Sequence, residues 1–147
     1  MRLLLPSFCL AVVLVLSGCG GVSDPTDPKT LAQCYATEFG QQPPAGVSNL
    51  KARQVIVGDA GGAWLRFVAD SNVVAQIISS RFTSSDRAAF ISDSGGGNTP
   101  AWWKPEDDSL ADYYICSQWR SGTNYSVAVL ACDAAHHVVY FHHGISF

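Results

Sequence analysis

The four histidines are the first residues whose spacing invites a chemical interpretation. They lie near the C-terminus in "HHVVYFHH", as the pairs His136/His137 and His142/His143. On a strand, His136 and His142 share one face but stand about 20 Å apart, and His137 and His143 do the same on the other face. Neither pair can hold one ion, and a site would have to recruit Cys132, Asp133 or more distant residues. We therefore predict no metal site and no cofactor, and expect an apolar strand with polar ends.

A serine in a glycine-rich segment is the next candidate. The stretch "SDSGGGN" around Ser94 resembles the Asp-Ser-Gly-Gly core of chymotrypsin-type serine proteases. In that family a histidine base and a buried carboxylate precede the serine, whereas every histidine here follows residue 135. The chain is also far too short for the double barrel of that family. The segment is therefore interpreted as a glycine-rich turn.

Four acidic residues gather in "PEDDSLAD", at Glu106, Asp107, Asp108 and Asp112. A calcium loop needs oxygen ligands at alternating positions and a glycine at the turn, and this segment has neither. Acidic residues directly after a proline are typical of a helix N-terminus instead.

The segment "TPAWWKPE" carries two adjacent tryptophans between prolines. We expect one of Trp102 and Trp103 to pack on the core while the other stays partly exposed. An exposed aromatic side chain in a stiff loop suits contact with a protein or sugar partner. Trp119 and Arg120, near a predicted turn, are expected to join this candidate partner-binding patch. The competing interpretation is that both loop tryptophans cover the edge of a sheet.

The N-terminus has the pattern of an export signal. Met1-Arg2 precedes an apolar run that continues without charge to Asp24, which is the shape of a secretory signal peptide. The run ends in Leu16-Ser17-Gly18-Cys19, which resembles the lipobox of bacterial lipoproteins. That resemblance implies cleavage after residue 18 and acylation of Cys19, with palmitate-type chains that anchor the protein in a membrane. It also implies a cell-envelope location, with the outer membrane favoured in a Gram-negative organism because Gly20 replaces an inner-membrane retention aspartate.

Composition limits the remaining chain to one domain. After residues 1–18 are removed, residues 19–30 read as an acylated cysteine and a flexible Gly/Pro-containing linker, and residues 31–147 as a single domain. The remaining chain then has eight basic and twelve acidic residues, and the basic residues are scattered singly along the sequence. This distribution gives no expectation of a nucleic-acid partner.

The elements that must position these residues follow from local signals. Asp27-Pro28 predicts the start of a short helix that stops at Gly40. "ARQVIVGD" and "GAWLRFVAD" predict a hairpin in which Leu65 and Phe67 face one side and Trp64 the other. "NVVAQIISSRF" predicts an amphipathic helix. Three β-rich runs after residue 112, with short connections, predict an antiparallel meander. The expected fold is α+β, a two-layer arrangement with an antiparallel sheet and helices on one face.

The cysteines that remain after export are Cys34, Cys116 and Cys132. Outside the cytoplasm, one disulfide and one free thiol is the simplest arrangement. A turn centred at residues 121–122 places Cys116 opposite Val127 and directs Cys132 to the other face, which argues against a bond between these two. Cys34 then pairs with whichever cysteine faces the helices. We favour Cys34–Cys116, although a register shift of one residue reverses the choice in favour of Cys132.

Together these patterns predict a lipid-anchored envelope protein that acts by binding. The expected role is a non-catalytic binding, inhibitory or accessory module for a periplasmic or surface protein. The alternative is a small hydrolase acting on cell wall or lipid, with a histidine such as His142 as base, or a glycan-binding module that uses the tryptophans. The sequence favours the binding module because it lacks a recognisable catalytic constellation.

Overall fold

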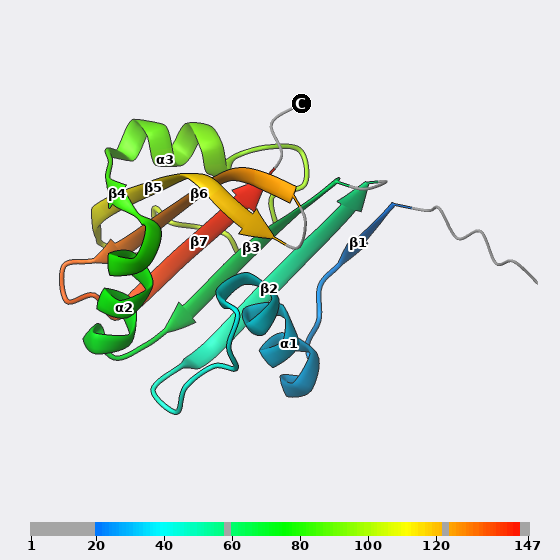
Figure 1. The fold of residues 1–147 in the computed structure, drawn as a ribbon, viewed down its shortest axis with the longest axis horizontal. Coiled ribbons are helices and arrows are strands. Elements are labelled where there is room, and N and C mark those ends of the chain that lie inside the picture. Colours follow the sequence, from blue (N-terminus) through cyan, green and yellow to red (C-terminus); the bar gives the residue numbers. More distant parts are fainter. Residues whose placement is uncertain (1–19, 58–59, 122–123, 145–147) are drawn as a thin grey trace, which may run out of the picture.

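The computed structural model describes residues 20–57, 60–121 and 124–144. Within these residues, seven antiparallel strands form one sheet and three helices pack against it (Figure 1). In chain order the elements are β1 (Gly21–Ser23), α1 (Pro28–Phe39), β2 (Ser48–Val57), β3 (Ala60–Val68), α2 (Ser71–Arg81), β4 (Thr83–Ser84), α3 (Arg87–Ser94), β5 (Leu110–Ser121), β6 (Asn124–Asp133) and β7 (Val138–Gly144). The predicted α+β class with an antiparallel sheet is confirmed.

The sheet has the strand order β1-β2-β3-β7-β6-β5-β4. Strands β5, β6 and β7 form the predicted C-terminal meander. Strand β7 also pairs with β3, so it joins the β2–β3 hairpin to the meander and occupies the centre of the sheet. His142 and His143 consequently lie on a central strand and are both buried, rather than forming an exposed polar end.

Helices α1 and α3 begin where an aspartate side chain accepts a backbone N–H group. Asp27 Oδ1 accepts from the Thr30 N–H at 2.8 Å at the start of α1, and Asp86 Oδ1 accepts from the Ala89 N–H at 2.9 Å at the start of α3. Helix α1 ends at Gly40, whose φ of 73° is left-handed and suits glycine. The boundaries of α1 are therefore those that the sequence predicts.

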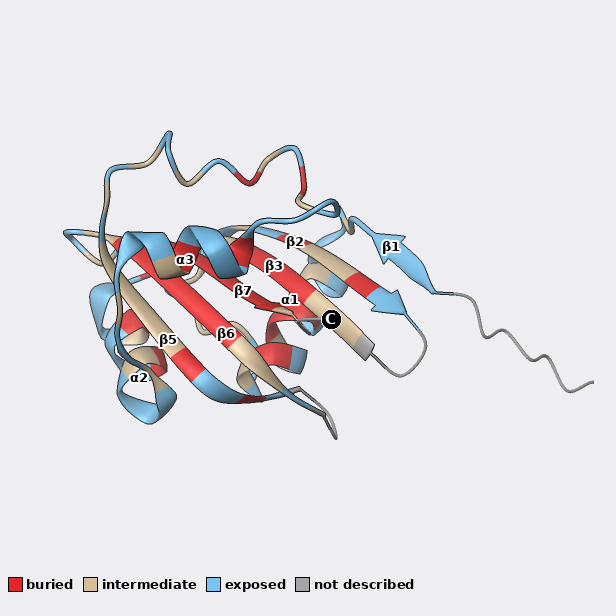
Figure 2. Cartoon of the chain, turned by 90° about the horizontal axis from the view of Figure 1, so that it is seen from above, coloured by how far each residue is buried: buried red, intermediate tan, exposed pale blue. Residues whose placement is uncertain are grey.

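Both faces of the sheet are covered. Helices α1 and α2 bury Tyr35 and Val74 against one face, where Phe67 and Phe141 point. Helix α3 and the segment 95–109 cover the opposite face, on which the core consists of Val55, Trp64, Phe90, Trp103, Val129, Ala131 and Tyr140. Figure 2, seen from above, shows α3 lying across the near face of the sheet, with the buried residues concentrated on the central strands.

The position of α3 differs from the expectation that the helices share one face. Helices α1 and α2 meet that expectation, but the chain passes around the sheet edge at β4, which pairs with β5, and α3 continues on the other face. Strand β6 explains why this face needs a cover, because successive residues Val129, Leu130 and Ala131 are all buried. A continuous apolar run of this kind is typical of a strand that is buried on both faces.

The predicted Cys34–Cys116 disulfide is absent from the structure, where Cys34, Cys116 and Cys132 are buried free thiols. The predicted register was wrong by one residue. An irregularity in β5 between Cys116 and Trp119 places Cys116 opposite Ala128. Cys116 and Cys132 therefore point to the same face as Cys34, and the argument that separated them by face fails.

The segment expected to be a linker is partly built into the domain. Residues Gly21–Ser23 form β1, which pairs with the edge of β2. Arg53 Nε donates to Asp24 Oδ1 at 2.7 Å, and α1 already begins at Pro28. The edge of β2 supplies backbone partners that the composition of the segment does not reveal. The expected signal peptide (residues 1–18) and the expected lipidation site Cys19 lie outside the described residues. In the part that is described, no helix has the length and apolarity to cross a bilayer.

Candidate binding cavity

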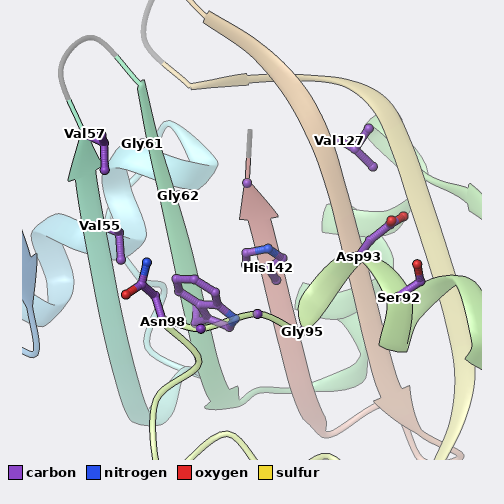
Figure 3. Close-up of a pocket in the computed structure, with 14 residues that line it drawn as sticks. Val55, Val57, Gly61, Gly62, Ser92, Asp93, Gly95, Asn98, Val127 and His142 are labelled. Atoms are coloured by element: carbon purple, nitrogen blue, oxygen red, sulfur yellow. The ribbon is translucent and has the colours of Figure 1, made fainter. Parts of the chain in front are cut away.

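A cavity of about 320 Å³ opens on the face of the sheet that carries α3. In Figure 3, Val55 and Val57 of β2 lie on one side of it, Ser92 and Asp93 of α3 lie on the other, and His142 of β7 lies between them. This volume is at the lower end of the range typical of sites for small ligands. It also suffices for one or two apolar side chains of a partner.

The cavity exists because two strands lack side chains at neighbouring positions. Trp64 pairs with His142 across β3 and β7, and the next residue on this face of each strand is a glycine, Gly62 and Gly144. A Cβ atom at Gly62 would stand 3.5 Å from the Gly144 Cα and 3.0 Å from the His143 carbonyl oxygen. Because neither glycine has a side chain, the backbone of the sheet is uncovered at this point and the cavity remains.

Trp64 and His142 form the floor of the cavity. Their rings stack with centroids 4.4 Å apart and planes inclined by 26°. The Trp64 Nε1–H donates to the Ser94 carbonyl oxygen at 3.0 Å, which ties the floor to the C-terminal end of α3. His142 Nδ1 lies 3.0 Å from the Ala63 carbonyl oxygen. Both side chains are therefore held in place before any ligand arrives.

His142 is neutral at physiological pH. Burial lowers its pKa to about 4, and the charge of His143 acts in the same direction, whereas the backbone groups of Ala63 and Asp93 raise it. An imidazole with so low a pKa binds a proton weakly, so it is a poor general base near pH 7. The floor of the cavity consequently presents an uncharged aromatic surface.

The glycine-rich segment forms the outer wall. Residues 95–97, together with Asn98, line the cavity, and Arg53 Nη1 donates to the Asn98 carbonyl oxygen at 2.9 Å. Thr99 Oγ1 donates to the Gly96 carbonyl oxygen at 2.7 Å, within a turn. Ser94 itself is buried, with its carbonyl accepting from Trp64. In "SDSGGGN" the residues 92–94 are the end of α3, and only residues 95–98 form the expected glycine-rich turn, which borders the cavity.

The two loop tryptophans divide as expected. Trp103 is 7% exposed and contacts Phe90 and Tyr140, with ring centroids 6.1 Å and 5.0 Å away. Trp102 remains partly exposed and meets Trp103 edge to face. Trp103 also lines a second hollow of about 180 Å³ beside α3, which includes Ile91. The tryptophan loop and the larger cavity thus flank the same helix.

An ionic cluster fastens the tryptophan loop to the sheet. Arg66 Nη2 lies 2.8 Å from Asp108 Oδ2, and the Tyr140 hydroxyl donates to the same carboxylate at 2.7 Å. The Tyr140 hydroxyl also lies 3.0 Å from the Lys104 carbonyl oxygen. Despite partial desolvation, which opposes the effect, hydrogen bonds from Tyr140 and Arg66 lower the pKa of Asp108. The acidic segment thus supplies a loop anchor instead of the expected helix N-terminus.

Trp119 does not join this surface. Trp119 is 2% exposed and lies in the core under α1 and α2, against Phe39 and Phe141, on the opposite face of the sheet. The guanidinium of Arg81 covers its ring at 5.0 Å. The irregularity in β5 that shifts the register of Cys116 also determines the face of Trp119. Arg120 is exposed, on the strand next to that buried residue.

Sequence reasoning missed His142 as a cavity residue. The alternation of β7 correctly places His142 and His143 on opposite faces, but it does not reveal that the strand is central. The available signal was the pair of glycines at positions 62 and 144, two residues from Trp64 and His142. A pairing register between β3 and β7 is needed to see that these glycines meet.

Comparisons with protein-family models, with curated proteins and with solved structures found no match to this chain. The function proposed below rests on the geometry of the cavity and on the N-terminal pattern.

Proposed function

We propose that this protein is a membrane-anchored envelope lipoprotein whose domain binds a protein partner on the face that carries α3. Cys19 carries the lipid, and the domain acts as a non-catalytic inhibitory or accessory module. The observation that carries the proposal is the preformed cavity between the β2–β3 hairpin and α3, which has apolar walls and exposed apolar residues on its borders.

Charge and polarity at the cavity fit a protein ligand. Val55, Val57, Trp64 and Val127 supply apolar walls, and Ser92, Asp93 and Asn98 supply polar groups at the rim. Val57 is 52% exposed at the cavity and Ile91 is 50% exposed at the neighbouring hollow. An apolar centre with a polar rim is the usual anatomy of a protein interface. We expect one or two apolar side chains of the partner to enter the cavity.

The anchor and the binding face are close in sequence. Strand β1 begins at Gly21, two residues after Cys19, and Asp24 is tied to Arg53, whose guanidinium also holds Asn98 at the cavity wall. A lipid on Cys19 therefore leaves the domain little freedom to move away from the membrane. The proposal favours a partner that is itself located at the membrane surface.

The hydrolase alternative has less support. Its base would be His142, and the low pKa of that buried imidazole disfavours proton abstraction near pH 7. A glycan-binding role for the tryptophans is weakened by the burial of Trp103, which leaves Trp102 as the accessible ring of the pair.

Site-specific photo-crosslinking tests the proposal. A photoreactive phenylalanine analogue is introduced at Val57 or at Ile91 in the full-length protein, expressed in its native host, and cross-linked products are identified by mass spectrometry. The matched control is the same analogue at Ile56, which is 57% exposed and points to the opposite face of β2. We expect one envelope protein to be cross-linked from positions 57 and 91 and not from position 56.

Two results would count against the proposal. Equal cross-linking from positions 56 and 57 would show that contact is not specific to the cavity face. The absence of any product at positions 57 and 91, with the protein folded and located in the envelope, would remove the partner.

A further inference from the structure

A cluster of three different ligand atoms lies at the other end of β5 and β6, away from the cavity. The carboxylate of Asp112, the thiol sulfur of Cys132 and an imidazole nitrogen of His136 all lie within 4.8 Å of one another. His136 Nε2 is 2.8 Å from Asp112 Oδ2. Cys132 is fully buried, whereas the side chains of His136 and Asp112 are 32% and 46% exposed. The cluster is therefore buried at Cys132 and open to solvent at His136 and Asp112.

Strand pairing brings the first two residues together. Asp112 stands directly opposite Cys132, because β5 carries an irregularity between Leu110 and Asp112. Leu110 contacts the core under α3, whereas Cys132 belongs to the core under α1 and α2. In a regular strand, residues two positions apart, such as 110 and 112, point to the same face. The bulge therefore turns Asp112 away from the face of Leu110 and toward the face of Cys132.

The β6–β7 turn supplies the third residue. Asp133 Oδ1 accepts from the backbone N–H groups of His137 and Val138 at 2.6 and 2.9 Å, and its carbonyl oxygen accepts from the His136 N–H at 2.8 Å. These bonds close the turn tightly, and His136 adopts a left-handed φ of 54°. The imidazole consequently lies beside Asp112 instead of along the line of β7.

We propose that Asp112, Cys132 and His136 form a binding site for one zinc ion. Sulfur, nitrogen and oxygen donors in one cluster suit a borderline-soft ion such as Zn²⁺, in contrast to the all-oxygen sites of Ca²⁺ and Mg²⁺. Ligands at roughly 2.0–2.3 Å from zinc stand about 3.3–3.8 Å apart in a tetrahedron. Donors that already lie within 4.8 Å of one another reach that geometry by side-chain rotation. The fourth position faces solvent and would take water.

The argument from histidine spacing still excludes a metal ion held by two histidines of the same strand face. It does not apply here because the site uses one histidine with two residues that the register supplies. Cys132 was recognised from the sequence as a ligand that such a site would need, but Asp112, on another strand, was not. The site is independent of the proposed partner-binding cavity, since it involves the opposite face of the sheet.

Metal titration of the full-length protein, purified in detergent under reducing conditions, tests the site. We expect one equivalent of Zn²⁺ to bind, and Co²⁺ in its place to give the thiolate-to-cobalt charge-transfer absorption. Asp112→Asn and His136→Ala should each weaken Zn²⁺ binding by roughly 100-fold, the upper end of losses seen even for outer-shell changes. Cys132→Ala should abolish the charge-transfer band.

Matched controls separate the site from general effects. His137→Ala removes an exposed histidine next to His136, and Cys116→Ala removes a buried thiol on the same face as Cys132. Both should bind Zn²⁺ as the wild type does. Circular dichroism verifies folding, and the two solvent-facing variants at 112 and 136 remain informative if Cys132→Ala does not fold. Folded wild-type protein that binds no Zn²⁺, or variants at 112 and 136 that bind it equally well, would overturn the proposal.

Discussion

Two neighbouring histidines show how the two faces of a strand give different roles to one residue type. His142 stacks on Trp64 at the cavity floor, whereas His143 lies on the other face with its Nδ1 2.8 Å from Glu38 Oε2. Glu38 is 3% exposed and also accepts from the Trp119 Nε1–H at 3.2 Å. His142 thus contributes to the cavity surface, whereas His143 lies against a buried carboxylate in the core.

The titration of His142 predicts a loss of stability in acid. Its pKa is about 4 in the folded protein against about 6.5 in the unfolded chain, so the unfolded chain binds more protons between these values. Stability from this group is complete above pH 6.5 and decreases as the pH falls toward 4, by up to about 3 kcal/mol. Urea unfolding at pH 7 and pH 5 measures it. His142→Phe keeps an aromatic ring and should show a smaller decrease than the wild type; an equal decrease in both would exclude His142 as the cause.

Breaking the buried Glu38–His143 pair should destabilise the fold strongly. Glu38→Gln leaves His143 and Trp119 without the carboxylate, and disturbing the partner of a buried polar group typically costs about 1–3 kcal/mol. Equilibrium unfolding at pH 7 measures the effect. Glu106→Gln, which changes an exposed glutamate in the same way, should remain within about 0.5 kcal/mol of the wild type. Equal small changes in both variants would show that the pair contributes little.

At the scale of elements, the tryptophan loop depends on its ionic anchor. The Asp108 carboxylate accepts hydrogen bonds from Arg66 and from the Tyr140 hydroxyl. The Tyr140 hydroxyl also lies within hydrogen-bond distance of the Lys104 carbonyl oxygen. These contacts hold the segment against the sheet over Trp103. The loop wall of the second hollow is therefore fixed by the sheet in addition to the hydrogen bonds of the loop's own turns.

Asp108→Asn should loosen this loop while leaving the sheet intact. We expect a loss of about 1–2 kcal/mol in unfolding free energy, reduced from the usual value for charged hydrogen bonds because the side chains of Arg66 and Asp108 are 19% and 26% exposed to solvent. Hydrogen exchange of residues 102–108 should accelerate, whereas β3 and β7 should keep their protection. Asp107→Asn, at the exposed neighbouring position, is the control. Unchanged exchange in the Asp108 variant would show that Trp103 packing alone holds the loop.

The types of the longer elements were predictable because their signals are local, whereas the short edge strands β1 and β4 were not predicted. The Asp27 cap, the Gly40 stop and the alternation of Leu65, Trp64 and Phe67 depend on a few adjacent residues. Register was not predictable, because the irregularities in β5 arise from packing between distant segments. Each irregularity changed the face of a side chain. The predicted surface position of Trp119 failed for this reason, and the Asp112–Cys132 pair was missed for the same reason.

At the scale of the whole molecule, the two faces of the sheet differ. The face under α1 and α2 is filled by aromatic side chains and the Glu38–His143 pair, whereas the face under α3 retains a cavity. The candidate site could be anticipated only in part. Trp102 and Trp103 were singled out from the sequence and lie on the face that carries the cavity. The cavity itself depends on β3 pairing with β7, strands that are far apart in sequence.

The proposed anchor predicts the behaviour of the whole protein in cells. Cys19→Ala should abolish incorporation of radiolabelled palmitate, because it removes the residue that carries the acyl chains. Without these chains, the protein should leave the membrane fraction. Cys34→Ala removes a buried thiol within α1 and should leave labelling unchanged. Labelling that survives Cys19→Ala would refute the assignment of the lipid to this residue.

The central claim is tested most directly by measuring how tightly the partner identified by cross-linking binds two surface variants. Val57 and Ile56 are adjacent, similarly exposed and on opposite faces of β2, and Val57 lines the cavity. We predict that Val57→Asp weakens the affinity for the partner roughly tenfold or more, because a charge is placed in an apolar contact, whereas Ile56→Asp leaves it unchanged. Equal affinities of the two variants, measured by calorimetry with the purified partner, would contradict binding at the α3 face.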